Sequence, residues 1–110
     1  PPDQVAAYFH ACDAGVHPFT MVPVCDAALP LNVVEFSVCG KPVLTNPLLE
    51  LRRQGLANVR FTKADTVEDW SAALRDPASF APFDHAALRP KLAPLDWAAT
   101  AAVIRKEMGL

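Results

Sequence analysis

The chain has 110 residues, enough for one small domain or for a piece of a larger one. Apolar residues make up 52% and charged residues 20%, a globular composition that excludes wholesale disorder. Ten Lys and Arg against twelve Asp and Glu give a net charge of −2, which argues against nucleic acid or an anionic membrane surface as a partner. No apolar run approaches the ~18 residues of a membrane span, and no signal peptide is recognisable. Because the chain begins Pro1-Pro2-Asp3 and not with Met, we expect it to be processed or excised.

Residue spacing predicts alternating helices and strands up to residue 76. Val5, Tyr8, Phe9 and Cys12 recur at three- and four-residue steps, as in an amphipathic helix. Residues 41–45 are apolar on both faces, as a parallel strand covered by helices requires. In chain order we expect a helix over 2–12, a strand over 13–17, a loop over 19–31, a helix over 31–38, a strand over 41–45, a helix from the Asn46 cap to Gly55, a strand over 58–62, and a helix over 66–76 capped by Thr66.

The chain after residue 76 has a different composition. Four prolines fall within 77–94, with Phe80 and Phe83 between them, so we expect an irregular segment that packs aromatic rings onto a surface. Asp96 is expected to cap a last helix over 97–108. The chain therefore divides into strand–helix units over 1–76, a Pro-rich segment over 77–94 and a C-terminal helix over 95–110. By spacing, the expected aromatic core anchors are Tyr8, Phe9, Trp70 and Trp97.

This alternation predicts the fold class, an α/β domain with a parallel sheet and right-handed crossovers. Three strands are fewer than the five or six of a doubly wound domain, so we expect half of a Rossmann-like domain with one open sheet edge. A homodimer through this edge, a swapped segment or another chain would cover it.

The cysteines carry no metal or disulfide signature. Cys12, Cys25 and Cys39 show no C-x-x-C spacing, and we expect reduced, buried thiols in a cytosolic protein. A zinc site from His10, Cys12, His17 and Cys25 is disfavoured, because residues 10–12 are predicted to be helical. We expect no metal.

The chemically informative stretch is 26–45. A helix that begins at Leu31-Asn32-Val33 offers free backbone N–H groups, which bind phosphate without a cationic side chain. Glu35, one turn later, can accept hydrogen bonds from a ribose diol, although a solvated helix position is the simpler interpretation of this residue. Together they predict a nucleoside-diphosphate site. His17, at a strand end, either contacts the ligand or is a hydrogen-bonded structural residue.

Positive charge for a diphosphate is scarce in this stretch. Residues 1–40 contain no Lys or Arg. The candidate cations within the chain are Lys41, Arg52 and Arg53, and a cation from outside the chain is an equal alternative.

Three motifs in order resemble a known family. They are D-x-x-x-x-P at Asp13–Pro18, P-L-x-x-x-E at Pro30–Glu35 and a motif of the A-x-G-K-P-V type within Ser37–Val43, with Thr45 and Trp97 also fitting. Their order and spacing are similar to those of the C-terminal, donor-binding domain of retaining GT-B glycosyltransferases of family 4. The resemblance covers essentially the whole chain.

The resemblance implies roles for individual residues. Glu35 matches the second glutamate of the family's E-x7-E motif, which binds the donor ribose. The turn that holds the diphosphate through its backbone amides matches Pro30, Leu31, Asn32 and Val33, with Asn32 where a lysine is frequent. The first glutamate of the motif falls at Ala27, and Asp26, one residue earlier, is its candidate substitute. His17 and Thr45 are further candidates for donor contact.

The function implied is donor binding by a fragment of a retaining glycosyltransferase. The donor would be a UDP- or GDP-sugar, and the acceptor a saccharide or lipid-linked glycan. The full-length protein would be an enzyme, cytoplasmic or peripheral at the inner membrane, needing no metal or cofactor, while this chain alone would be inactive. The alternative is a degenerate Rossmann-like module for protein interaction or oligomerisation. A sugar-nucleotide epimerase is disfavoured because the chain has no Y-x-x-x-K.

Overall fold

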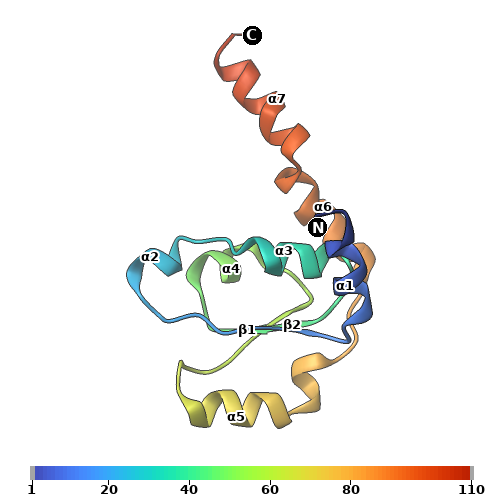
Figure 1. Ribbon diagram of the computed structural model, residues 1–110. Coiled ribbons are helices and arrows are strands. Elements are labelled where there is room, and N and C mark those ends of the chain that lie inside the picture. Colours follow the sequence, from blue (N-terminus) through green and yellow to red (C-terminus); the bar gives the residue numbers. More distant parts are fainter. Residues whose placement is uncertain (1, 110) are drawn as a thin grey trace.

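The computed structural model describes residues 2–109 and contains a three-stranded parallel sheet flanked by helices, a Rossmann-like α/β arrangement (Figure 1). The strands are β1 (Gly15–His17), β2 (Val43–Thr45) and β3 (Val59–Phe61), in the order β1-β2-β3. The predicted fold class and parallel pairing are confirmed.

The strands are shorter than predicted, because the regular ladder covers only three residues of each. Single hydrogen bonds extend the pairing by one residue at the ends. The N–H of Gly15 donates to the carbonyl of Pro42 at 2.8 Å, and the N–H of Thr62 donates to the carbonyl of Thr45 at 2.9 Å. The predicted bounds thus include residues that pair through one bond but do not continue the ladder.

Helical segments connect and follow the strands. In chain order they are η1 (Pro2–Gln4), α1 (Val5–Ala11), α2 (Pro23–Asp26), α3 (Leu31–Val38), α4 (Leu49–Gln54), α5 (Val67–Arg75), η2 (Pro77–Phe80), η3 (His85–Leu88), α6 (Arg89–Leu92), η4 (Ala93–Leu95) and α7 (Trp97–Glu107). The predicted bounds of α3 and the two side-chain caps are confirmed. Thr66 Oγ1 accepts from the N–H of Asp69 at 3.1 Å, and Asp96 Oδ1 accepts from the N–H of Ala98 at 2.9 Å.

Three local predictions are wrong. The predicted loop over 19–31 contains α2, since Pro23 takes the first helical position, where a proline is tolerated. The Pro-rich segment over 77–94 forms short helical turns, because three of its four prolines, Pro77, Pro90 and Pro94, fall at the starts of η2, α6 and η4. Asn46 does not cap α4, whose N-cap is Leu48, because its side chain bonds to two other loops.

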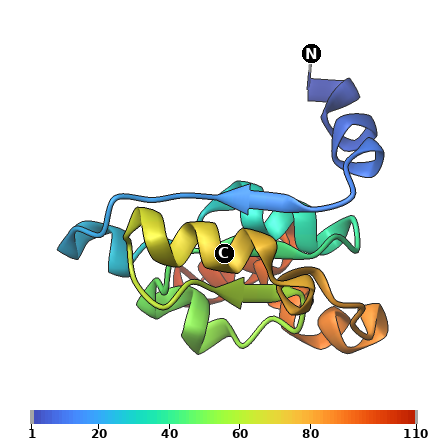
Figure 2. The same cartoon turned by 90° about the horizontal axis from the view of Figure 1, so that it is seen from below.

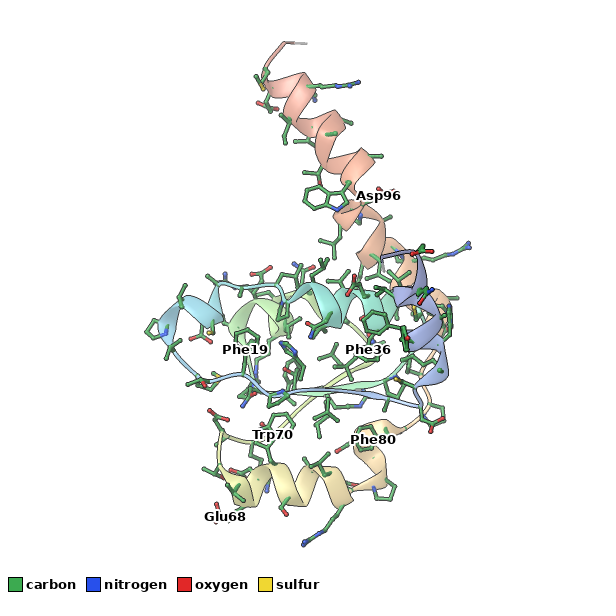
Figure 3. All side chains as sticks on the ribbon, in the orientation of Figure 1. Phe19, Phe36, Glu68, Trp70, Phe80 and Asp96 are labelled. Atoms are coloured by element: carbon green, nitrogen blue, oxygen red, sulfur yellow. The ribbon has the colours of Figure 1, made fainter. Side chains whose placement is uncertain are left out.

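Helices cover both faces of the sheet (Figures 1 and 2). α2, α3 and α4 lie on one face, and α5 with η2 lies on the other. Val33 of α3, Leu51 of α4 and Val43 of β2 are fully buried in one hydrophobic cluster. In Figure 3, Phe19 and Phe36 lie on the α3 side of the sheet, while Trp70 and Phe80 lie on the α5 side.

The expected aromatic anchors are only partly buried. Phe9 packs edge-on against Phe36 with ring centroids 4.4 Å apart, and Trp70 is half-buried. Tyr8 is 69% exposed and Trp97 is 80% exposed, so both predictions are wrong. The reason for Trp97 is that α7 projects away from the sheet (Figure 1). Within residues 2–109, no helix has the length and apolar character needed to cross a membrane.

Candidate functional site

The candidate site lies at the carboxyl edge of the sheet, where ligands bind in open parallel sheets. β1 ends there at His17, and the chain continues through α2 before it reaches the first turn of α3. The side-chain amide of Asn32, in that first turn, donates to Nδ1 of His17 at 2.9 Å. This hydrogen bond places the N-terminus of α3 beside the end of β1.

The first turn of α3 presents unused backbone donors. Its N-cap, Pro30, offers no side-chain cap. The Pro30 carbonyl accepts from the N–H of Val33 at 3.1 Å and of Val34 at 3.3 Å. Within residues 2–109, the N–H groups of Leu31 and Asn32 have no hydrogen-bond acceptor. These two donors and the positive end of the helix dipole favour an anion here.

His17 contacts this first turn of α3 through its ring. Its ring is half-buried beside Phe19, with centroids 4.8 Å apart. Burial lowers the pKa of His17 below its usual 6.5, so the ring is neutral at pH 7. Because Nδ1 accepts from Asn32, the ring proton lies on Nε2, a buried atom without a partner in the described part of the chain. The contact with Asn32 fits the structural role predicted for His17.

Glu35 lies on the outer side of α3, one turn after Leu31. Val33 and Ser37 form the buried face of the helix, whereas Glu35 is half-buried. Its carboxylate has no hydrogen-bond or ion partner among the residues described. Because positions four apart share a helix face, the Glu35 carboxylate and the free N–H of Leu31 lie along the same side of α3.

The other predicted residues lie apart from this turn. Thr45 is fully buried, and its hydroxyl donates to the carbonyl of His17 at 3.0 Å, joining β2 to β1. Asp26 lies at the end of α2, where Oδ1 accepts from the N–H of Leu49 at 3.4 Å. Asp26 is therefore at the start of α4 and not at the start of α3.

The candidate cations do not gather at this edge. Lys41 donates its N–H to the carbonyl of Phe36 at 2.9 Å, at the far end of α3, which is about 12 Å long. Arg52 lies over the ring of Phe61, 5.1 Å from its centroid, and Arg53 lies 3.9 Å from Glu50. As phosphate partners these three residues stay predictions, since no contact of their charged groups with the first turn of α3 is present within residues 2–109.

Sequence reasoning missed a hydrogen-bonded pair at the same edge, buried Asn46 and exposed Asp65. Asn46 Nδ2 donates to Asp65 Oδ1 at 2.7 Å. Asn46 follows β2 directly, and Asp65 lies in the loop after β3. Polar residues after successive parallel strands were the available signal, since such strand ends meet at one edge.

The cysteines are all free, but not all are buried. Cys25 is buried and Cys39 half-buried, while Cys12 is exposed at the end of α1, so the expectation of three buried thiols is wrong. No group of three or more His, Cys, Asp or Glu within residues 2–109 is arranged to hold a metal ion.

Comparison of the chain with protein-family models, with curated proteins and with solved structures finds no match.

Proposed function

We propose that the chain is part of a retaining glycosyltransferase of the GT-B type and binds the nucleoside diphosphate of a UDP- or GDP-sugar at the carboxyl edge of its sheet. The first support is the resemblance of its three motifs, in order, to the donor-binding domain of glycosyltransferase family 4. The second is the observation that carries the proposal. The N-terminus of α3 has two free backbone donors and a carboxylate without a partner one turn later.

Each part of the ligand has a matching group. The N–H groups of Leu31 and Asn32 would donate to phosphate oxygens, and His17 would hold the Asn32 side chain aside through their hydrogen bond. The carboxylate of Glu35 would accept from the ribose hydroxyls. A helix rises about 6 Å over four residues, a separation that a phosphate and its adjoining ribose can span.

The proposed role of this edge of the sheet in the reaction is electrostatic. As the bond between the sugar and the diphosphate breaks, charge grows on the departing nucleoside diphosphate, and preoriented N–H donors stabilise that charge. Lys41 lies at the other end of α3, so the remaining positive charge would come from outside the chain. The acceptor, a saccharide or lipid-linked glycan, would also bind outside it. We therefore expect the chain alone to bind nucleotide weakly and to transfer no sugar.

Calorimetry or ligand-observed NMR with UDP and GDP tests this proposal. Glu35→Ala is expected to weaken binding about tenfold, which corresponds to about 1.4 kcal/mol, in the range of one hydrogen bond to a charged group. Glu107→Ala, an exposed helical glutamate on α7, is the matched control and should leave affinity unchanged.

A second pair of variants isolates the backbone donor. Leu31→Pro removes one free N–H at the first helical position, where proline is well tolerated. Leu31→Ala removes the same side chain but keeps the N–H. The proposal expects weaker binding for Leu31→Pro only. The proposal would be overturned if Leu31→Pro, Leu31→Ala and Glu35→Ala all bound nucleotide with the affinity of the wild type. Absence of UDP and GDP binding by the wild type would overturn it too.

One observation favours the alternative of an interaction module. β1 pairs only with β2 within the described residues, and Val16 at this open edge is 48% exposed. An open groove of about 410 Å³ adjoins the edge, lined in part by Pro18, Trp70 and Leu74. A second copy could pair its own β1 here and continue the sheet. Sedimentation tests this candidate, because Val16→Lys should convert a dimer to a monomer.

A further inference from the structure

A hydrogen-bonded side-chain pair, buried Asn46 and exposed Asp65, connects the three loops that follow the strands. Asn46 is 0% exposed, and both ends of its amide are used. Its Oδ1 accepts from the N–H of Phe19 at 2.5 Å, and its Nδ2 donates to Asp65 Oδ1 at 2.7 Å. The second carboxylate oxygen of Asp65 accepts from the N–H of Met21 at 3.4 Å. Two of these three bonds reach residues 18–21, and the third joins Asn46 to Asp65.

The chemistry of the pair fixes its orientation. The N–H of Phe19 requires an acceptor, so the oxygen of the Asn46 amide must face it and the NH₂ group must face Asp65. An ionised carboxylate on one side makes that second bond charge-assisted, and such bonds are about twice as strong as neutral ones. An aspartate at position 46 could not donate and would place two carboxylates against each other.

The segment that the pair holds follows β1 and leads into α2, so it is joined to the proposed site through His17. His17 immediately precedes it and bonds to Asn32 in the first turn of α3. Thr45, the residue before Asn46, bonds to the carbonyl of His17. Residues 18–21 therefore continue directly from the residue whose ring contacts Asn32.

We propose that Asn46 and Asp65 are the positioning residues of the nucleotide site. They fix the loop after β1, and through His17 they hold the first turn of α3 in the orientation that binds phosphate. This inference rests on the proposed function. It assigns neither residue a contact with the nucleotide.

Exchanging the two residues tests the proposal directly. In Asn46→Asp/Asp65→Asn, the new carboxylate accepts from Phe19 and from the new amide, and the amide oxygen accepts from Met21. All three bonds of the wild type are thus retained, and only the bond between the two side chains reverses its direction. Asn46→Asp alone opposes two carboxylates and loses the bond between the pair. Gln54→Glu is the matched control, because Gln54 makes a similar amide–carboxylate bond to Glu50, 2.7 Å long and confined to α4.

Two measurements on the full chain distinguish an effect on the loop after β1 from an effect on nucleotide binding. Hydrogen exchange of the Phe19 and Met21 amides reports on the loop without any nucleotide, and calorimetry with UDP and GDP reports on the site. Asn46→Asp should speed exchange at both amides and weaken nucleotide binding, each at least tenfold. The double variant should return both to within about twofold of wild type, and Gln54→Glu should change neither. Should Asn46→Asp fail to fold, Asp65→Asn keeps the bond to Asn46 and should speed exchange at Met21 but not at Phe19.

The outcomes are distinguishable from failure of the proposed function. Unchanged exchange in Asn46→Asp, or in Asp65→Asn if that variant replaces it, would show that the pair does not hold the loop and would overturn the inference. Restored exchange without restored affinity in the double variant would show that the loop does not position the site, and would overturn it too. In both cases the effects of Glu35→Ala and Leu31→Pro would still support nucleotide binding. If those two variants bound nucleotide as tightly as the wild type, the proposed function itself would be refuted.

Discussion

Asn58→Leu is expected to destabilise the fold by about 2–4 kcal/mol. Asn58 is 1% exposed and precedes β3. Its amide donates to Ser37 Oγ at 2.9 Å and to the carbonyl of Lys41 at 2.8 Å, and so connects the buried face of α3 to the entrance of β2. Leu has the same branched skeleton and is somewhat larger, so the variant removes the hydrogen bonds without opening a cavity.

The magnitude follows from the groups left behind. Two lost hydrogen bonds account for about 2 kcal/mol, since each contributes about 1 kcal/mol net. The Lys41 carbonyl loses its donor, which solvent replaces only in part, and this adds up to about 2 kcal/mol. Ser37 Oγ keeps its own bond to the Val33 carbonyl at 2.8 Å and adds little. At about 4 °C per kcal/mol, Tm should fall by roughly 8–16 °C.

Urea and thermal unfolding followed by circular dichroism measure this change. Gln54→Leu is the control, because its amide bonds only to Glu50 on the same helix and should cost about 0.5 kcal/mol or less. Ser37→Ala combined with Asn58→Leu should destabilise by less than the sum of the two, because the residues share one bond. A free energy of unfolding for Asn58→Leu within about 0.5 kcal/mol of wild type would refute this reasoning.

Further predictions concern His17, Gly15 and Trp97. Because burial lowers the pKa of His17 while the unfolded ring titrates near 6.5, its contribution to stability is full above pH 6.5 and is lost as the pH falls below it. Urea unfolding should show a steeper loss of stability on acidification for wild type than for His17→Gln. Gly15→Ala places a Cβ 2.7 Å from the Phe36 ring and should cost about 1–3 kcal/mol in chemical unfolding, partly recovered by adding Phe36→Leu. Trp97→Ser, at an 80% exposed position, should change stability by less than about 0.5 kcal/mol in the same assay.

The parts of the fold that sequence predicts are those with local causes. α3 begins after Pro30, and the chain leaves it at Gly40, which has a φ of 70° that other residues rarely adopt. Thr66 and Asp96 cap their helices with their own side chains. Each of these signals acts within a few residues, so the sequence alone contains it.

The parts that sequence did not predict depend on distant residues. An Asn-Pro dipeptide is typical of a helix start, but Asn46 bonds to Phe19, 27 residues earlier, and that partner is invisible to local patterns. Helical spacing indicates an apolar stripe at Tyr8 and Trp97 without showing what covers it. Lys41 is close to α3 in sequence yet lies at the wrong end, because α3 runs back along the sheet before β2 begins.

The candidate site therefore depends on the contacts that hold α3 in place as well as on the residues that face the ligand. Its buried face is anchored by Ser37 to Asn58, and its first turn is anchored by Asn32 to His17. The first anchor sets where the helix lies on the sheet, while the second sets how its free N–H groups are presented. Loss of the first should lower stability more than affinity, and loss of the second should do the opposite. Measuring both quantities on Asn58→Leu and His17→Gln would separate the scaffold from the site.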